Sequence, residues 1–184
     1  MKNLILAFLA SVSLSKAVIT NFDLIGTAGP GLLPGNEPAA PAGGTGGEIG
    51  AGIFFDDSAN TLTINVGWGS SQGFADLSSA ANNSHIHGPT AAINGSGFTQ
   101  TAGVLFNLTR SSNAITGGII TTAPITLTAA QKTDLFNGKY YINLHTATNG
   151  GGEMRGFLVA VPEPTAALCG MVTLGVLTIR RRRA

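Results

Sequence analysis

Residues 139–158, KYYINLHTATNGGGEMRGFL, decide the fold of this chain. Apolar and polar side chains alternate over residues 140–145, which is typical of a β-strand with one buried face. The glycines of residues 149–152 can adopt the positive φ angles that a hairpin turn requires. Glu153 and Arg155 then follow on one face of a returning strand. The stretch therefore predicts an antiparallel β-hairpin.

Shorter alternating segments predict further strands along the chain. The clearest covers residues 61–68, where Leu62, Ile64, Val66 and Trp68 face one way. The other predicted strands are residues 18–25, 48–55, 84–88, 103–108 and 115–121. A Pro- and Gly-rich stretch follows the first of these strands and is either an irregular loop of the domain or a disordered linker.

One short helix is predicted over residues 128–136. Thr128 can cap its first turn, Gln131 completes a capping box, and Gly138 follows its end. Short strands with a single brief helix favour an all-β fold, an antiparallel Greek-key β-sandwich or barrel.

Residues 1–17 have the features of a signal peptide. A lysine at position 2 precedes an apolar run over residues 4–14, and small residues at Ser15 and Ala17 allow cleavage after Ala17. The order of these features predicts an exported protein.

The C-terminal residues 161–184 combine a Pro-Glu-Pro motif, a short apolar segment and an arginine cluster. The apolar residues 165–179 would span about 22 Å as a helix, which is less than the ~30 Å hydrocarbon core of a bilayer. By itself, this segment predicts a marginal membrane anchor. The combination resembles a PEP-CTERM sorting signal, which implies an exosortase partner, transient insertion in the inner membrane, and delivery to the cell surface or extracellular matrix. The residues of the motif are Pro162, Glu163, Pro164, Arg180, Arg181, Arg182 and Arg183.

The composition excludes some partners and crosslinks. Only 10% of the residues are charged, compared with roughly 25% in typical soluble domains, and residues 18–161 carry a net charge of −4. A nucleic-acid partner is therefore not expected. The single cysteine, Cys169, lies in the C-terminal tail, so the exported domain has no disulfide bond.

The three histidines form a candidate metal site. His85 and His87 are two residues apart on a predicted strand, so both side chains project from the same face. His145 lies on the first strand of the hairpin and could join them, which would give a ligand set suited to Cu or Zn. The alternative is that the histidines only hydrogen-bond backbone groups and fix loops.

Four motifs in order resemble the CHRD family, named after chordin. They are His85-Ile86-His87-Gly88-Pro89, the capped helix before Gly138, Tyr141-x-Asn143-x-His145-Thr146, and Gly152-Glu153-x-Arg155-Gly156. The resemblance gives a CHRD domain at residues 48–160, preceded at residues 18–47 by the first strand and the Pro/Gly-rich loop. It implies an immunoglobulin-like β-module with binding or matrix roles and no catalytic activity.

Two further expectations concern chemistry. The H-x-H pair also resembles the copper strand of Cu/Zn superoxide dismutases, but three histidines are too few for a dinuclear site of that type. Glu153 and Arg155 are expected to form an ion pair that holds the hairpin.

Taken together, the sequence features predict a non-enzymatic surface or matrix protein with a binding or structural role. Exopolysaccharide or other surface proteins are its expected partners. The alternative is a Cu- or Zn-binding module.

Overall fold

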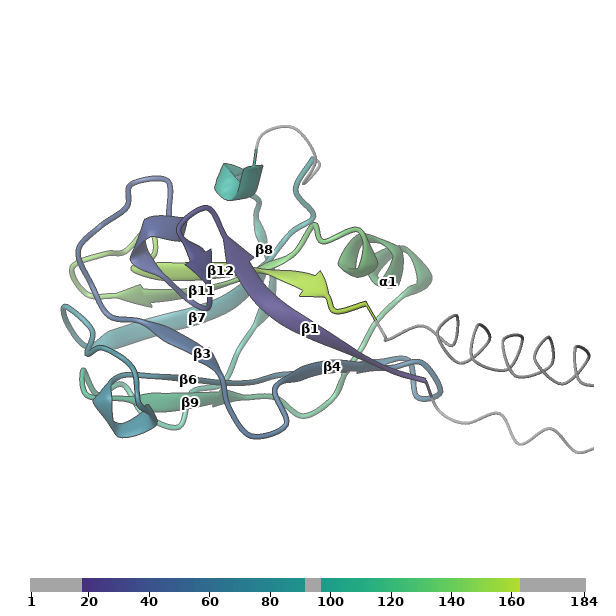
Figure 1. Ribbon diagram of the computed structural model, residues 1–184, viewed down its shortest axis with the longest axis horizontal. Helices are drawn as coiled ribbons and strands as arrows, with labels where there is room; N and C mark the ends of the chain where they lie inside the picture. The colour runs from purple at the N-terminus through teal and green to yellow at the C-terminus, as the bar shows by residue number, and fades with distance from the viewer. Residues whose placement is uncertain (1–17, 92–96, 163–184) are drawn as a thin grey trace, which may run out of the picture.

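The computed structural model describes residues 18–91 and 97–162 (Figure 1). The predicted signal peptide and the sorting tail from Glu163 onward lie outside these residues. The strands are β1 (Ile19–Gly26), β2 (Gly29–Pro30), β3 (Gly46–Glu48), β4 (Ile53–Asp56), β5 (Thr61–Thr63), β6 (Asn65–Trp68), β7 (Ala81–His87), β8 (Val104–Asn107), β9 (Gly118–Thr121), β10 (Ile125–Thr126), β11 (Tyr141–Thr146) and β12 (Met154–Ala160). The helices are α1 (Ala129–Phe136) and the short 3-10 helices η1 (Pro34–Asn36), η2 (Ser70–Gln72) and η3 (Gly97–Thr99).

The strands form two antiparallel sheets. The larger sheet has the order β10-β5-β4-β1-β12-β11-β7-β8, with β2 paired to β1, and curls around the core. The smaller sheet has the order β3-β6-β9 and lies below β7, β11 and β12 in Figure 1. Strand β1 pairs with β12, so the first and last described strands are neighbours. The predicted all-β, antiparallel fold is confirmed.

The predicted strand over residues 61–68 is divided between the two sheets. β5 pairs with β4 in the larger sheet, whereas β6 pairs with β3 and β9 in the smaller one. The side chains of Leu62, Ile64, Val66 and Trp68 are all completely buried, as the alternation predicts. The segment therefore forms a corner where one run of chain passes from sheet to sheet around a shared core.

The prediction of one continuous strand over residues 48–55 is wrong. It is interrupted between β3 and β4, where Gly50 and Gly52 have φ angles of 56° and 67°. These left-handed conformations are open to glycine and turn the chain out of the extended state. The result is a turn that sends β3 and β4 to different sheets.

Helix α1 confirms the capping prediction. The Oγ1 of Thr128 accepts a hydrogen bond from the backbone N of Gln131 at 3.2 Å, and the Oε1 of Gln131 accepts one from the backbone N of Thr128 at 2.8 Å. Gly138, at φ 64°, follows the helix end. The helix lies at one end of the domain in Figure 1 and packs the ring of Phe136 edge-on against Phe22 at 5.5 Å.

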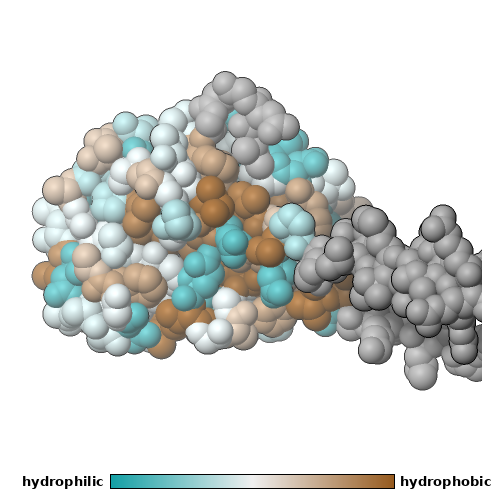
Figure 2. Space-filling model, viewed as in Figure 1, coloured by the Kyte–Doolittle hydropathy of each residue, from teal (hydrophilic) through white to brown (hydrophobic). Residues whose placement is uncertain are grey.

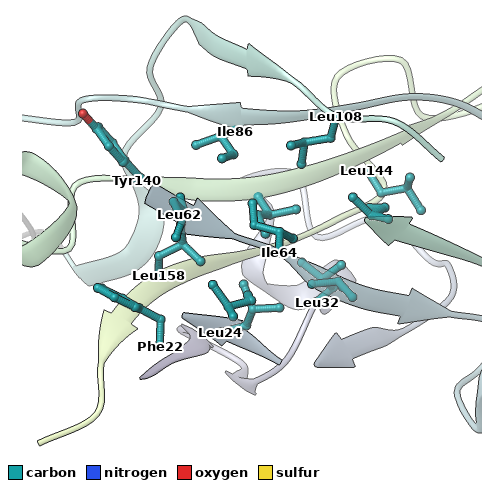
Figure 3. Close-up of a cluster of buried hydrophobic side chains, with 14 of the residues drawn as sticks. Phe22, Leu24, Leu32, Leu62, Ile64, Ile86, Leu108, Tyr140, Leu144 and Leu158 are labelled. Atoms are coloured by element: carbon teal, nitrogen blue, oxygen red, sulfur yellow. The ribbon is translucent and has the colours of Figure 1, made fainter. Parts of the chain in front are cut away.

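Side chains from both sheets fill one hydrophobic core. Figure 3 shows Phe22, Leu24, Leu62, Ile86 and Leu158 pointing into the same interior, and each is at most 2% exposed. Burying a side chain of this size contributes roughly 1.5–3 kcal/mol relative to leaving it exposed. On the outer face seen in Figure 2, hydrophilic and hydrophobic residues are interspersed. Among the described residues, no helix has the length and apolar character needed to cross a bilayer.

The Pro/Gly-rich residues 26–47 are part of the domain. Leu32 is fully buried, and Leu33 forms an isolated antiparallel bridge with Arg155 of β12. The side chain of Asn36 is 2% exposed and donates from Nδ2 to the carbonyl oxygen of Arg155 at 3.0 Å. The interpretation of this stretch as a disordered linker is therefore wrong.

The predicted hairpin of residues 139–158 is confirmed as strands β11 and β12, which pair antiparallel. Ile142, Leu144 and Met154 belong to the core. Because side chains alternate along a strand, Asn143 and Arg155, which are cross-strand partners, face the opposite way. That second face carries the candidate site.

Candidate functional site

The fold brings the three predicted histidines together on β7 and β11. These strands pair antiparallel, with His87 opposite Tyr141 and His85 opposite Asn143. One ring nitrogen from each of His85, His87 and His145 lies within 4.8 Å of the others. The predicted histidine cluster, His85, His87 and His145, therefore exists as a geometric unit.

Backbone carbonyls fix the ring orientation of two members of the histidine cluster. The Nδ1 of His145 lies 2.9 Å from the carbonyl oxygen of Gly150, and the Nδ1 of His87 lies 3.0 Å from that of Ala102. A carbonyl oxygen only accepts, so both Nδ1 atoms carry a proton, and in the neutral form of each ring the Nε2 atom carries a lone pair. Histidine ligands of metals in proteins are typically oriented in this way.

His85 completes the cluster and stays neutral. Its Nδ1 lies 3.1 Å from the Nε2 of His145 and donates to it, since that Nε2 is an acceptor. Burial lowers the pKa of His85 to about 4, and electrostatic repulsion between its protonated form and His145, His87 and Arg110 acts in the same direction. At neutral pH the ring is therefore in the uncharged form that binds metals.

The Nε2 of His87 is buried and has no hydrogen-bond partner among the described residues. The ring is stacked on that of Tyr141, with centroids 4.9 Å apart and an interplanar angle of 5°. Burial is the main cause that lowers the pKa of His87. A fixed, neutral imidazole with an unused buried lone pair is suited to metal coordination.

Arg155 holds two loops against the strands beside the cluster. Its side chain is fully buried, and it donates from Nε to the carbonyl oxygen of Asn36 at 2.5 Å. Its two terminal nitrogens donate to the carbonyl oxygens of Gln100 at 3.0 Å and Phe98 at 2.9 Å. The guanidinium also lies 4.9 Å from the ring centroid of Tyr141. One side chain therefore connects the loops at residues 34–43 and 97–102.

The predicted ion pair of Glu153 with Arg155 is wrong. Within the residues that the structure describes, the acidic partner of Arg155 is Glu37, whose Oε2 lies 3.9 Å from Nε. Glu37 is 6% exposed, and its Oε1 has no hydrogen-bond partner among those residues. Burial raises the pKa of Glu37 to about 7, although Arg155 opposes this shift.

Glu153 instead fastens the hairpin turn to two other segments. Its Oε1 accepts from the backbone N of Gly44 and of Ser78, both at 2.8 Å, and its Oε2 accepts from Thr146 Oγ1 at 2.7 Å. Burial alone would raise the pKa of Glu153, but the hydrogen bonds from Ser78, Gly44 and Thr146 together outweigh burial and lower it. The two charged side chains have different partners because Glu153 precedes β12 and bonds to residues of the turn, whereas Arg155 lies within the strand.

A pocket of about 470 Å³ opens beside the cluster. This volume is within the range of small-ligand sites, roughly 300–1,000 Å³. Its walls include Glu37, His87, Tyr141, Asn143, Gly150 and Arg155. The Oδ1 of Asn143 is a further buried atom without a hydrogen-bond partner in the described part of the chain. His87 is thus both a member of the cluster and a wall of the pocket.

Sequence reasoning missed Glu37 and the pocket. Glu37 lies in a Pro/Gly-rich loop without hydrophobic periodicity, so no local pattern indicates that it is buried. The only sequence signal is an acidic residue among apolar and small neighbours. Pro162 ends the described chain and is exposed; the other predicted sorting residues, Glu163, Pro164 and Arg180 to Arg183, lie outside it.

The fold and the site define an antiparallel β-domain with three converging imidazoles. The CHRD domain family model matches residues 32–158, more than half of the chain, and the chain belongs to this family. The match begins within the Pro/Gly-rich loop, in agreement with the packing of that loop on the domain. CHRD domains occur in extracellular or secreted proteins, which fits the predicted export. No curated protein and no solved structure matches the chain.

Proposed function

We propose that this CHRD protein is a non-enzymatic, exported binding domain and that its histidine cluster binds Cu or Zn. The observation that carries the proposal is the approach of His85, His87 and His145, whose ligand atoms all lie within 4.8 Å. Imidazole nitrogens suit both metals, and three of them supply most of a tetrahedral site. Bound Zn would supply a Lewis-acidic centre beside the pocket, and bound Cu would supply a redox-active one.

Three properties of the site support metal binding over a purely structural role. The Nε2 of His87 is buried without a partner, and carbonyl oxygens of Ala102 and Gly150 orient two of the rings. Burial favours the neutral form of His85 and His87. Histidines that only fixed loops would not need to bring one ring nitrogen each within 4.8 Å of the others.

The test is a metal titration of the purified full chain with Cu²⁺ and Zn²⁺. We expect micromolar or tighter binding in the wild type, and at least about tenfold weaker binding after His85→Ala, His87→Ala or His145→Ala, which is about 1.4 kcal/mol. Asn83→Ala is the matched control, because Asn83 is exposed on β7 opposite His145 and has no imidazole. Absence of binding in the wild type would contradict the proposal.

We also propose that the protein reaches the cell surface or matrix through its C-terminal tail. The Pro162-Glu163-Pro164 motif, the apolar segment and the terminal arginines support processing by an exosortase-type protease after transient membrane insertion. Exopolysaccharide or other surface proteins would then be its neighbours. Mass spectrometry of the mature protein from an exosortase-containing host tests this: retention of Arg180 to Arg183 would contradict it.

A further inference from the structure

The histidine cluster leaves part of a metal's coordination shell unfilled. Within residues 18–91 and 97–162, the cluster holds three histidines and no cysteine or carboxylate. Structural zinc sites are closed by four protein ligands, whereas sites that bind and activate small molecules have three protein ligands and an open position. A metal on His85, His87 and His145 would therefore belong to the open class.

The 470 Å³ pocket reaches this cluster through two residues. His87 belongs to both, and its buried Nε2 is the unpartnered ligand atom of the cluster. Gly150, whose carbonyl oxygen orients His145, also lines the pocket. The pocket is therefore the route by which a small molecule would approach a metal on the cluster.

The charges around the pocket select the ligand class. Among its lining residues, Glu37 is the only acid and Arg155 the only base, and their charged groups lie 3.9 Å apart. Because burial raises the pKa of Glu37 to about 7, this carboxyl group offsets the charge of Arg155 only in part near neutral pH, and the three imidazoles would be neutral ligands. The charge of a divalent metal would then be uncompensated in a mostly buried site, which favours an anion over a neutral or cationic ligand.

Arg155 uses three of its five N–H donors on backbone carbonyls, which leaves two N–H groups and its positive charge to attract an anion. The remaining walls combine small apolar residues, such as Pro38, Ala39 and Pro41, with uncharged polar ones, such as Thr101 and Asn149. A bound metal and Arg155 would therefore both attract a negative ligand in this pocket, and the volume of the pocket limits the size of that ligand.

We propose that the pocket admits a small anion, of carboxylate or azide size, to the open coordination position of a metal held by His85, His87 and His145. This inference rests on the metal binding proposed above. It assigns to the domain a second binding step, in which the loaded metal captures an external ligand.

The experiment uses the purified full chain loaded with one equivalent of Cu²⁺ and titrated with azide. Azide coordination is followed by its charge-transfer absorption band and by the change in the copper EPR spectrum; formate serves as a second anion in the EPR measurement. Ala39→Trp places a large ring in the wall of the pocket, at an exposed residue that is not a member of the histidine cluster. Ala51→Trp is the matched control, since Ala51 is exposed in the turn between β3 and β4 and does not line the pocket.

We expect saturable azide binding in the wild type and in Ala51→Trp, and azide affinity at least about tenfold weaker in Ala39→Trp, with copper affinity unchanged. If copper binds but azide leaves both spectra unchanged, the open position is refuted while metal binding stands. Equal azide affinity in Ala39→Trp and the wild type would refute the role of the pocket. If copper does not bind at all, both proposals fail together.

Discussion

The Nδ1 of His85 lies 3.1 Å from the Nε2 of His145, although sixty residues separate them in the chain. Strand pairing explains this approach, because β7 and β11 are neighbours and place both rings on the same face. The contact is a hydrogen bond between two imidazoles, and a metal on these nitrogens would compete directly with the proton that joins them. Metal binding should therefore become weaker as these rings are protonated.

Metal binding should stabilise the folded protein. At a free metal concentration 100 times the dissociation constant, Cu²⁺ or Zn²⁺ should add about 2.7 kcal/mol to the free energy of unfolding. Thermal unfolding of the purified protein measures this shift, and a chelator should reverse it. Mg²⁺ is the control, since it prefers oxygen ligands. An equal shift by Mg²⁺, or a full shift by Zn²⁺ in His145→Ala, would show that the effect arises elsewhere.

Arg155→Lys should destabilise the fold by roughly 3–5 kcal/mol, because a lysine ammonium cannot reach three carbonyl oxygens on two loops and would remain a poorly compensated buried charge. Urea denaturation measures this loss. Arg110→Lys is the matched control: Arg110 also donates three hydrogen bonds, but it lies at the surface, partly exposed. Similar losses in the two variants would contradict the role assigned to Arg155.

Glu37→Gln should change how stability depends on pH. The folded-state pKa of Glu37 is raised from 4.5 to about 7, so its favourable contribution is complete below pH 4.5 and is lost as the pH rises through about 7. Glutamine does not titrate. The stability of Glu37→Gln relative to the wild type should therefore rise between these pH values, by up to roughly 3 kcal/mol.

The measurement for Glu37 is urea denaturation of both proteins from about pH 4 to pH 8, the range in which the carboxyl group titrates. Asp23→Asn provides the control, because Asp23 is an exposed carboxylate on β1. A difference between wild type and Glu37→Gln that does not vary with pH would show that the Glu37 pKa is not raised.

Gly152→Ala should destabilise the protein and disturb the pocket. Gly152 has a φ of 127°, which alanine rarely adopts, and its added Cβ would lie 2.5 Å from the amide of Asn143 and 2.6 Å from the Oε1 of Glu37. We expect a loss of about 2–4 kcal/mol in thermal unfolding, from backbone strain and overpacking together. At Gly150, in the same turn, a Cβ would meet no atom within 4 Å, so Gly150→Ala should cost far less.

Local patterns predicted the parts of the structure that are governed by local physics. Alternation predicted β11 and β12, the capping residues Thr128 and Gln131 predicted α1, and the H-x-H spacing predicted a shared face for His85 and His87. The position of His145 on a predicted strand of the hairpin makes it the third candidate ligand. These features depend on periodicity or on residues a few positions apart.

The contacts that complete the site depend on packing between distant segments. Glu37 meets Arg155 only because the loop at residues 34–43 folds onto β12, and nothing near Glu37 in the sequence indicates that contact. Glu153 and Arg155 have the spacing of a same-face pair, yet each finds better-placed donors or acceptors on other loops. In the same way, the alternation over residues 61–68 predicts burial correctly but contains no signal for the passage between sheets at Ile64.

The three hydrogen bonds of Arg155 have a mechanical consequence. Because one planar group holds Asn36 on one loop and Phe98 and Gln100 on another, the two sides of the pocket cannot separate independently. A molecule that displaces one loop must strain or break the attachment of the other. The two loops at the entrance to the histidine cluster should therefore move together, because Arg155 couples their positions.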